Sequence, residues 1–267
     1  MNEEKLNIWV LSHKDVDNLF DYDECYKQMH IGAAINPETK CEYKDNIGIN
    51  ISEKNPFYCE LTGIYWVWKN ATKKDYVGFE HYRRHFNLPT DEILSILNNY
   101  DVILPEQREI YTTVRTDYFT NHSFHDWLSL EEVVKRLYPD YIESWDKYFN
   151  KIDTMYYRNM FITTWDNFES ICNFIFSILD EFVKKEGLYT PEDYANHIEK
   201  YAEHTMFWEH NTINTDWKTY QMRICGFIAE RLTTLWMKHN IKPEKRYELE
   251  YETNGKLMEV NKIKAEL

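Results

Sequence analysis

The chain has 267 residues, 43% of them hydrophobic and 16% aromatic, which is enough for one domain with a full core. Its 7 glycines and 7 prolines argue against long disordered linkers. The net charge of −14 argues against non-specific nucleic-acid binding, because Lys and Arg contacts to phosphates supply most of that affinity.

The first predicted element is a buried strand. Residues 6–11 form an apolar run of suitable length. The polar residues that follow it are Ser12, His13 and Lys14. Residues 46–51 fit a short strand or a loop. This segment would bring Asn50 and Ser52 to the same crevice as the residues that follow the strand predicted over residues 76–79.

The central stretch begins with a predicted helix over residues 55–70. Asn55 followed by Pro56 is a helix-start signal, because Asn can accept a free backbone N–H and Pro fixes φ at the first helical position. One apolar face is formed by Leu61, Ile64, Tyr65 and Trp68. Gly63, on a neighbouring stripe, permits another element to approach closely.

A short buried strand is predicted over residues 76–79. The residues that follow it are Glu80, His81, Tyr82, Arg83, Arg84 and His85. In an open α/β sheet, ligands bind beyond the carboxyl ends of the strands, so this cluster is a candidate site. Guanidinium groups match phosphate oxygens, which favours a phosphate or diphosphate ligand. The alternative is that Arg83 and Arg84 form a solvated strand end paired with surface acids.

Helix and strand then alternate. Residues 91–99 show helical spacing of apolar side chains, and residues 100–104 fit a core strand closed by Pro105. This alternation predicts the α/β class. Residues 106–120 are polar and irregular, as in a mobile lid or an acceptor loop.

His122 and Asp126 precede a helix predicted over residues 128–138. Either Asp126 or His122 could act as a general base that removes a proton from a hydroxyl group. A role for Asp126 as the cap of that helix is the favoured alternative.

The second half contains one more predicted strand, residues 155–162, and two amphipathic helices, residues 166–184 and 220–239. Residues 186–220 are rich in Tyr, His and Trp, which suits either sugar stacking or an insertion, and we assign no site there. The residues from 241 onward are charged and of mixed sign, which predicts an exposed tail after a domain of residues 1–240.

Two long strings carry a family resemblance: NISEKNPFYCELTGIYWVWKN, from residue 50, and YVGFEHYRRHF, from residue 76. Shorter pieces agree with it: residues 100–105, His122 with Asp126, residues 159–162 and residues 226–232. Together they resemble a family of uncharacterised bacterial proteins encoded in capsule, exopolysaccharide and O-antigen loci. Its members are generally taken to be glycosyltransferases with a GT-A-type fold. The resemblance implies an α/β, Rossmann-like domain with a mostly parallel sheet, flanking helices and a helical insertion.

The resemblance also implies a function, namely transfer of a hexose, for example galactose in its pyranose or furanose form, from a UDP-sugar to a lipid-linked polysaccharide acceptor. The residues expected to bind the donor are Ser12, His13, Lys14, Asn50, Ser52, Glu60, His81, Tyr82, Arg83 and Arg84. An ordinary strand-to-helix loop is the alternative at the first three of these positions.

Catalytic and acceptor residues are also expected. The catalytic candidates are Asp126, His122 and Glu80. The resemblance places Asn159 and Met160 near the acceptor sugar, although a satisfied Asn in a core strand is equally favoured. Glu230 is the third acceptor candidate. An ion pair between the buried Glu230 carboxylate and an arginine of the site is favoured over a role of Glu230 as catalytic base.

A divalent cation, Mn²⁺ or Mg²⁺, is common in enzymes of the resembling fold, where it binds near an Asp-x-Asp motif. Glu80-His81-Tyr82 stands in the place of that motif here, and hard cations prefer more carboxylates than this. We therefore favour arginines as the groups that neutralise the leaving diphosphate, with metal dependence left open.

Five scattered cysteines without zinc-type spacing suit a reducing cytoplasm. Cys59 is interpreted as a packing residue rather than a nucleophile. The start of the sequence does not read as a signal peptide and no apolar run has membrane-span length, so we expect a cytoplasmic protein. A peripheral contact with the inner face of the plasma membrane stays open.

Two other functional classes are compatible with the sequence. A phosphosugar or phosphoryl transferase would use the same arginines on a phosphate and release no nucleoside diphosphate. A non-catalytic carbohydrate-binding subunit of a polysaccharide assembly complex would fit the aromatic content and bind glycan independently of nucleotide.

Overall fold

A seven-strand path through one large sheet organises the protein, as seen in a computed structural model that describes residues 4–15, 20, 22–201, 217–254 and 256–257. The strands are β1 (Leu6–Ser12), β2 (Tyr26–His30), β3 (Tyr43–Lys44), β4 (Tyr76–His81), β5 (Arg84–His85), β6 (Val102–Pro105), β7 (Arg108–Glu109), β8 (Thr154–Met155), β9 (Phe161–Thr164), β10 (Arg246–Leu249), β11 (Glu252–Thr253) and β12 (Lys256–Leu257). The α-helices are α1 (Asn55–Tyr58), α2 (Leu61–Asn70), α3 (Thr90–Leu97), α4 (Val114–Asn121), α5 (Phe124–Leu137), α6 (Ile142–Asn150), α7 (Trp165–Glu186), α8 (Pro191–Tyr201), α9 (Trp217–Gln221) and α10 (Ile224–Asn240).

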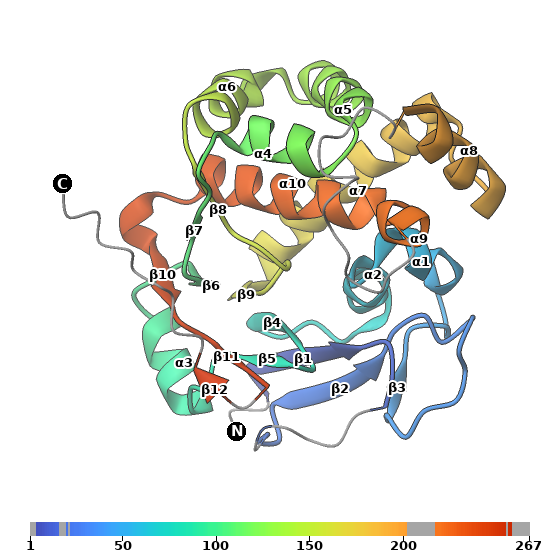
Figure 1. The fold of residues 1–267 in the computed structure, drawn as a ribbon. Helices are drawn as coiled ribbons and strands as arrows, with labels where there is room; N and C mark the ends of the chain where they lie inside the picture. Colours follow the sequence, from blue (N-terminus) through green and yellow to red (C-terminus); the bar gives the residue numbers. More distant parts are fainter. Residues whose placement is uncertain (1–3, 16–19, 21, 202–216, 255, 258–267) are drawn as a thin grey trace.

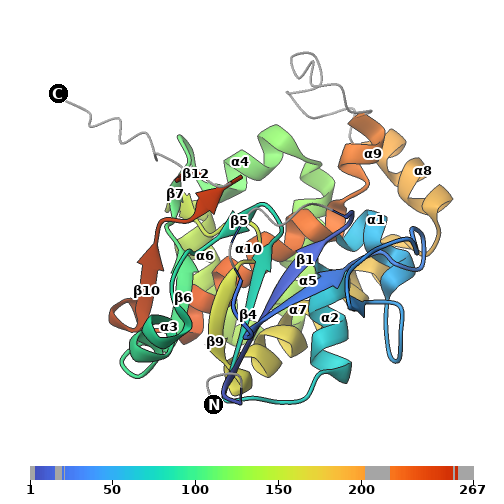
Figure 2. The ribbon, with the colours of Figure 1, turned by 90° about the horizontal axis from the view of Figure 1, so that it is seen from below.

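The sheet order is β10-β6-β9-β4-β1-β2-β3. Its pairs are parallel except those of β9, which runs antiparallel to both of its neighbours. Figure 2 shows β10, β6, β9, β4 and β1 side by side in this order. The prediction of an α/β domain with a mostly parallel sheet is confirmed.

Side chains alternate between the two faces of the sheet, as strand geometry requires. In β1, Trp9 and Leu11 pack into the large core beneath the helices, while Leu6, Ile8 and Val10 pack into a second core on the opposite face. Helix α3 covers that second core, whereas α4–α7 and α10 lie together above the first (Figure 1).

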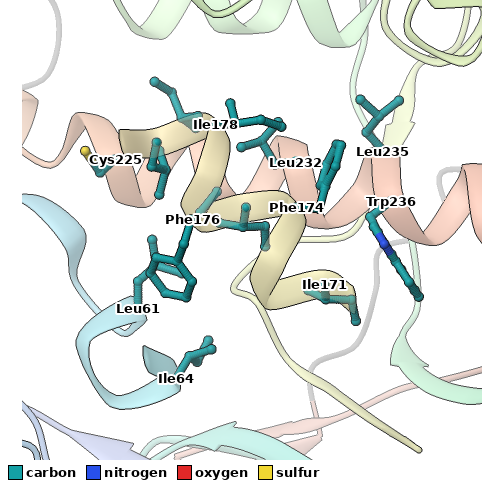
Figure 3. Packing of buried hydrophobic residues seen from close by; sticks show 14 of the residues in the cluster. Leu61, Ile64, Ile171, Phe174, Phe176, Ile178, Cys225, Leu232, Leu235 and Trp236 are labelled. Carbon is teal, nitrogen blue, oxygen red and sulfur yellow. The ribbon is translucent and has the colours of Figure 1, made fainter. Parts of the chain in front are cut away.

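Helix α7 is the centre of the larger core. Thr164 caps its start by accepting a hydrogen bond from the amide of Asn167, and Gly187, with φ of 70°, ends it in a left-handed C-cap. Its apolar side chains lie between α10 and α2 (Figure 3). Gly63 of α2 packs on the sheet: an added Cβ would lie 2.8 Å from a Leu11 methyl group and 2.7 Å from an Ile31 methyl group. The predicted close approach at Gly63 is confirmed.

The predicted helix over residues 55–70 is two helices, because the chain breaks between α1 and α2. Cys59 has a φ of 52°, and the side-chain amide of Asn55 donates to the Cys59 carbonyl at 2.9 Å and to Thr62 at 3.1 Å. Asn55 therefore holds the break rather than capping the helix, whose N-cap is Lys54. The predicted strand over residues 155–162 is likewise interrupted, with β8 and β9 on either side of a loop.

The segment from residue 241, indicated by its sequence as a charged tail, rejoins the sheet in the structure. Strand β10 pairs in parallel with β6, and β11 pairs with β5. Mixed charge hid these strands because each is short and lies at an edge, where polar side chains are tolerated. Residues 258–267 of this segment, like residues 202–216 of the aromatic-rich stretch, lie outside the described part of the chain.

Candidate active site

The ends of β1 and β4 bring two predicted groups together. The strands are parallel and Leu11 lies opposite His81, so the residues that follow each strand meet at one edge. The His13 ring meets the Tyr82 ring edge-on at 5.6 Å. Lys14 Nζ lies 5.8 Å, and the Arg83 guanidinium 5.1 Å, from the centre of the same ring. The geometry thus gathers His13, Lys14, Tyr82 and Arg83.

Three other predicted donor residues bind the backbone near them. The Ser12 hydroxyl donates to the Lys14 carbonyl. Buried Ser52 accepts from the Ala34 amide at 3.0 Å and donates to Asp45. Asn50 accepts from the amide of Ser52 at 3.2 Å. These bonds shape the loops beside the strand ends, and the bond from Ser12 fixes the backbone of Lys14. The bonds of Ser52 and Asn50 do not involve the residues around Tyr82.

Glu80 and His81 point to opposite faces of the sheet. Fully buried Glu80 lies on the side of the second core, where its carboxylate accepts from His85 Nδ1 at 2.6 Å and from the Phe86 amide at 3.2 Å. His81 lies on the helix side, where its Nε2 donates to the Arg158 carbonyl at 2.8 Å. Burial, reinforced by Arg84, lowers the pKa of His81 to about 3, so the ring is neutral at physiological pH.

Four arginines form what we term the cationic cluster: Arg84, Arg108, Arg158 and Arg223. Arg84, Arg158 and Arg223 all depress the pKa of His81. Burial, followed by the charges of Arg84 and Arg108, lowers the pKa of Arg158 to about 10. The cluster is drawn from β5, β7, the β8–β9 loop and the start of α10, so only the folded chain assembles it.

The cationic cluster is electrostatically incomplete. In the described part of the chain, none of its four guanidinium groups forms an ion pair with a carboxylate. The buried Nε of Arg84 has no hydrogen-bond partner among the same residues. Three of the four arginines are half-buried and Arg223 is exposed. Positive charges that are partly withdrawn from water repel each other, and an anion that binds between them reduces this repulsion and accepts hydrogen bonds from the guanidinium groups.

Two carboxylates border this cluster, namely Glu60 and Glu230. Glu60 accepts from the Asn159 side chain at 2.8 Å, and Asn159 in turn accepts from Thr233 at 2.6 Å. Glu230 accepts from the Arg158 amide at 2.7 Å and forms an ion pair with Arg231 at 3.3 Å, which is the pairing with an arginine that the sequence favoured. Burial raises the pKa of both carboxyl groups. Of the two, Glu230 has the more accessible side chain, with 18% of its area exposed.

These bonds hold a strained loop. Arg158 and Asn159 have φ values of 75° and 50°, a left-handed conformation that costs free energy in residues other than glycine. Met160, the next residue, is buried in the second core on the opposite face. The structure therefore brings Asn159 and Glu230 to the cluster and separates Met160 from it.

Cys59 lies beside the cluster and its Sγ accepts from Arg223 Nε at 3.0 Å. Burial raises the pKa of this thiol to about 12, which keeps it protonated and disfavours a nucleophilic role. Gly226 allows the contact, because a Cβ there would lie 3.0 Å from Sγ.

The two remaining catalytic candidates lie among the helices. His122 Nδ1 lies 3.1 Å from the Gln221 amide oxygen, and the ring stacks on Phe227. Asp126 is buried and accepts from His197 Nε2 at 2.6 Å. The cap of α5 is Ser123, which accepts from the Asp126 amide, and not Asp126 as the sequence favoured.

Metal binding is a poor fit to these donors. Both oxygens of Glu80 are engaged, on the face of the sheet away from His81. In the described ranges no group of three or more His, Cys, Asp or Glu residues could hold a metal ion. Around His81, the neighbouring charges are those of arginines, which repel a divalent cation.

Residues 7–207 match the family described as "Domain of unknown function (DUF4422)". The chain belongs to the DUF4422 family. Among the described residues of this DUF4422 protein, no helix is long and apolar enough to cross a membrane. No curated protein matches the chain at a significant level.

A solved structure supports the fold assignment. The DUF4422 protein resembles the apo structure of WbbM, a bifunctional glycosyltransferase, with a TM-score of 0.72 and 25% sequence identity. The match covers 95% of this chain and 46% of the WbbM chain, so the protein spans about half the length of that relative. This similarity agrees with the predicted GT-A-like fold.

Sequence reasoning singled out Arg84 and its neighbour Arg83, but not Arg108, Arg158 or Arg223, the other three members of the cationic cluster. Arg158 directly precedes the predicted Asn159, which was the available signal. Arg108 lies in a segment that was expected to be a lid or an acceptor loop, and Arg223 lies in a predicted helix. The sequence around each of them therefore gave no indication that they share a site with Arg84.

Proposed function

We propose that this DUF4422 protein is a glycosyltransferase that takes its sugar from a nucleotide diphosphate donor, with UDP-hexose as the first candidate. The observation that carries the proposal is the cationic cluster, whose arginines lack carboxylate partners in the described ranges. A diphosphate supplies the missing negative charge and accepts bidentate hydrogen bonds from guanidinium groups. The resemblance to WbbM supports the same reaction class.

The strand ends would divide the donor between them. Lys14, His13 and Arg83 surround Tyr82 on the β1 side, and Arg84 and Arg158 lie on the β9 side. As the glycosidic bond to the donor breaks, negative charge grows on the leaving diphosphate. Fixed guanidinium groups stabilise that charge without reorganisation, which is the electrostatic role that a metal ion plays in other enzymes. We accordingly propose that transfer is independent of Mn²⁺ and Mg²⁺.

Glu230 is the carboxylate we propose as general base towards the acceptor hydroxyl. It borders the cluster, retains an accessible edge and has a raised pKa, which brings its basicity closer to neutral pH. The proposed acceptor is a lipid-linked polysaccharide unit, with a hexose as the transferred sugar. The expected cytoplasmic location at the membrane surface stays a prediction.

Calorimetry with UDP tests the donor site. Arg84→Ala should remove most of the UDP affinity, about 30-fold or more, since hydrogen bonds between charged groups contribute about 2 kcal/mol. Its melting temperature should stay near that of the wild type because Arg84 has no ion pair to lose. Arg136→Ala is the matched control: Arg136 pairs with Glu181 at 2.7 Å and should leave UDP binding unchanged.

Unaltered UDP affinity in Arg84→Ala would contradict the proposal. Product analysis separates the reaction classes, because a glycosyltransferase releases UDP from the donor, whereas a phosphosugar or phosphoryl transferase does not. A binding subunit without catalysis would retain glycan while releasing no UDP. Activity that is lost in EDTA and restored by Mn²⁺ would contradict the metal-independent mechanism.

A further inference from the structure

The segment that follows α10 returns to the candidate site. Strand β10 adds to the β6 edge of the sheet, and β11 pairs with β5, so Thr253 lies opposite Arg84. The amide of Asn254 also donates to the Arg83 carbonyl at 2.8 Å. Residues 246–254 lie beyond the matched range of the family, residues 7–207, yet they contact the backbone of both predicted arginines.

Tyr251, between β10 and β11, contacts the cluster with its side chain. Its hydroxyl accepts a hydrogen bond from Nη1 of Arg158 and another from Nη2 of Arg108, the latter at 3.3 Å. Its ring is buried in the second core, with 8% of the residue exposed, and lies 5.3 Å from the Arg158 guanidinium. One buried phenol thus joins an arginine of β7 to an arginine of the β8–β9 loop.

The chemistry of this partner matters. A carboxylate in the same place would pair with the guanidinium groups and reduce their attraction for an anion. A phenol oxygen is neutral, and its two acceptor sites can orient both side chains while leaving their charge intact. Burial, followed by the charges of Arg84 and Arg108, lowers the pKa of Arg158, which agrees with positive charges that the phenol leaves uncompensated. Tyr251 therefore fixes the direction of the arginines at little cost to their charge.

We propose that residues 246–254, through Tyr251, complete the nucleoside diphosphate site by orienting Arg108 and Arg158 towards the diphosphate. Tyr251 is a positioning residue, since it acts through the two arginines. The inference rests on the proposed function. It adds a part of the chain that lies outside the matched family range and assigns ligand contacts to Arg108 and Arg158.

Tyr251→Phe removes the hydroxyl and keeps the buried ring. The full chain carrying this change should bind both UDP and inorganic pyrophosphate about five- to tenfold more weakly in calorimetry, because each guanidinium loses one fixed hydrogen bond. Its melting temperature should stay close to that of the wild type. Tyr247→Phe is the matched control in the same segment: Tyr247 packs on Tyr100 and should leave both affinities unchanged.

A double-mutant cycle separates positioning from a general structural effect. Adding Tyr251→Phe to Arg158→Gln should weaken pyrophosphate binding by less than Tyr251→Phe does alone, since part of its effect passes through Arg158. Fully additive losses, or wild-type affinity in Tyr251→Phe, would overturn the inference while leaving the glycosyltransferase proposal in place. A wild-type protein that binds neither UDP nor pyrophosphate would instead overturn the proposed function itself.

Discussion

Two clusters of ionisable side chains in this protein differ in one respect. The cationic cluster at the strand ends contains arginines without carboxylate partners in the described ranges. The second cluster, among α5, α7 and α8, comprises Asp126, His125, His197, Glu186 and Ser129, which we term the closed cluster. In it, Asp126 is bound by His197, and Glu186 is bound by both His125 and Ser129.

The contrast shows how to separate structural from functional charge. A buried carboxylate bound by a histidine is satisfied within the protein, so it holds helices together and offers little to a ligand. The arginines of the cationic cluster have no carboxylate partner in the described ranges, so their charge is available to an anionic ligand. Charge without an opposite partner is therefore a better indicator of a ligand site than burial of polar residues alone.

The largest expected effect tests whether the carboxylate beside the cationic cluster takes part in catalysis. Glu230→Gln keeps the shape and the hydrogen bond to the Arg158 amide, but it loses the charge that pairs with Arg231 and cannot accept a proton. We expect kcat to fall roughly 1,000-fold, the usual contribution of a general base, while UDP affinity stays within about twofold of the wild type. Turnover is measured as UDP release, with exposed Glu199→Gln as the control. Normal turnover in Glu230→Gln would assign Glu230 a purely structural role.

The closed cluster should respond in the opposite way. Asp126→Ala leaves His197 buried without its partner, so the free energy of unfolding should fall by about 3 kcal/mol. UDP affinity, measured under conditions where the variant is folded, should not change. Denaturant unfolding followed by circular dichroism gives the first quantity and calorimetry the second. If UDP binding fell together with stability, the distinction between the clusters would be lost.

A third variant sharpens the comparison from the cationic side. Arg158→Gln removes one of the mutually repelling charges, so we expect UDP affinity to fall about tenfold, or about 1.4 kcal/mol, with no loss of stability. Thermal unfolding without ligand checks the second half of this prediction. Arg136→Gln, which breaks a surface pair with Glu181, serves as the control for charge removal. A strongly destabilised Arg158→Gln would mean that this arginine is structural.

The smallest expected effect concerns pH. Burial lowers the pKa of His122 to about 3, whereas the unfolded chain takes up a proton near the ordinary pKa of about 6.5. Below pH 6.5 the unfolded state therefore binds more protons than the folded state, and the free energy of unfolding decreases as the pH is lowered. Between pH 7 and 5.5 the wild type should lose about 1 kcal/mol more than His122→Gln. Equal losses in urea titrations of the two proteins would contradict the assigned burial.

Much of the fold could be predicted from the sequence, because apolar periodicity acts over short distances. The strand over residues 76–79 and the helix over residues 166–184 are examples, each extended slightly in the structure as β4 and α7. The break at Cys59 could not be predicted, since it depends on hydrogen bonds from Asn55 that compete with continued helix. The β10 and β11 strands were missed because their pairing partners lie far away in the sequence.

The same reasoning applies to the site. Arg83 and Arg84 were recognised because they follow a strand directly, and the structure places both at the strand ends. Glu80 was selected from the same string, but strand alternation turns it to the opposite face, where His85 binds it. Arg108, Arg158 and Tyr251 meet only through the tertiary fold, so no local pattern indicates that they belong together.

The position of Tyr251 also has a consequence for biosynthesis. Strand β11 is translated after every described helix, and it supplies the backbone partner of β5. A nascent chain that has emerged only as far as α10 could thus form the large core yet lack the phenol that joins Arg108 and Arg158. By the proposal above, full affinity for nucleotide would then appear late, and a chain stalled before β10 would bind nucleotide more weakly than the complete protein.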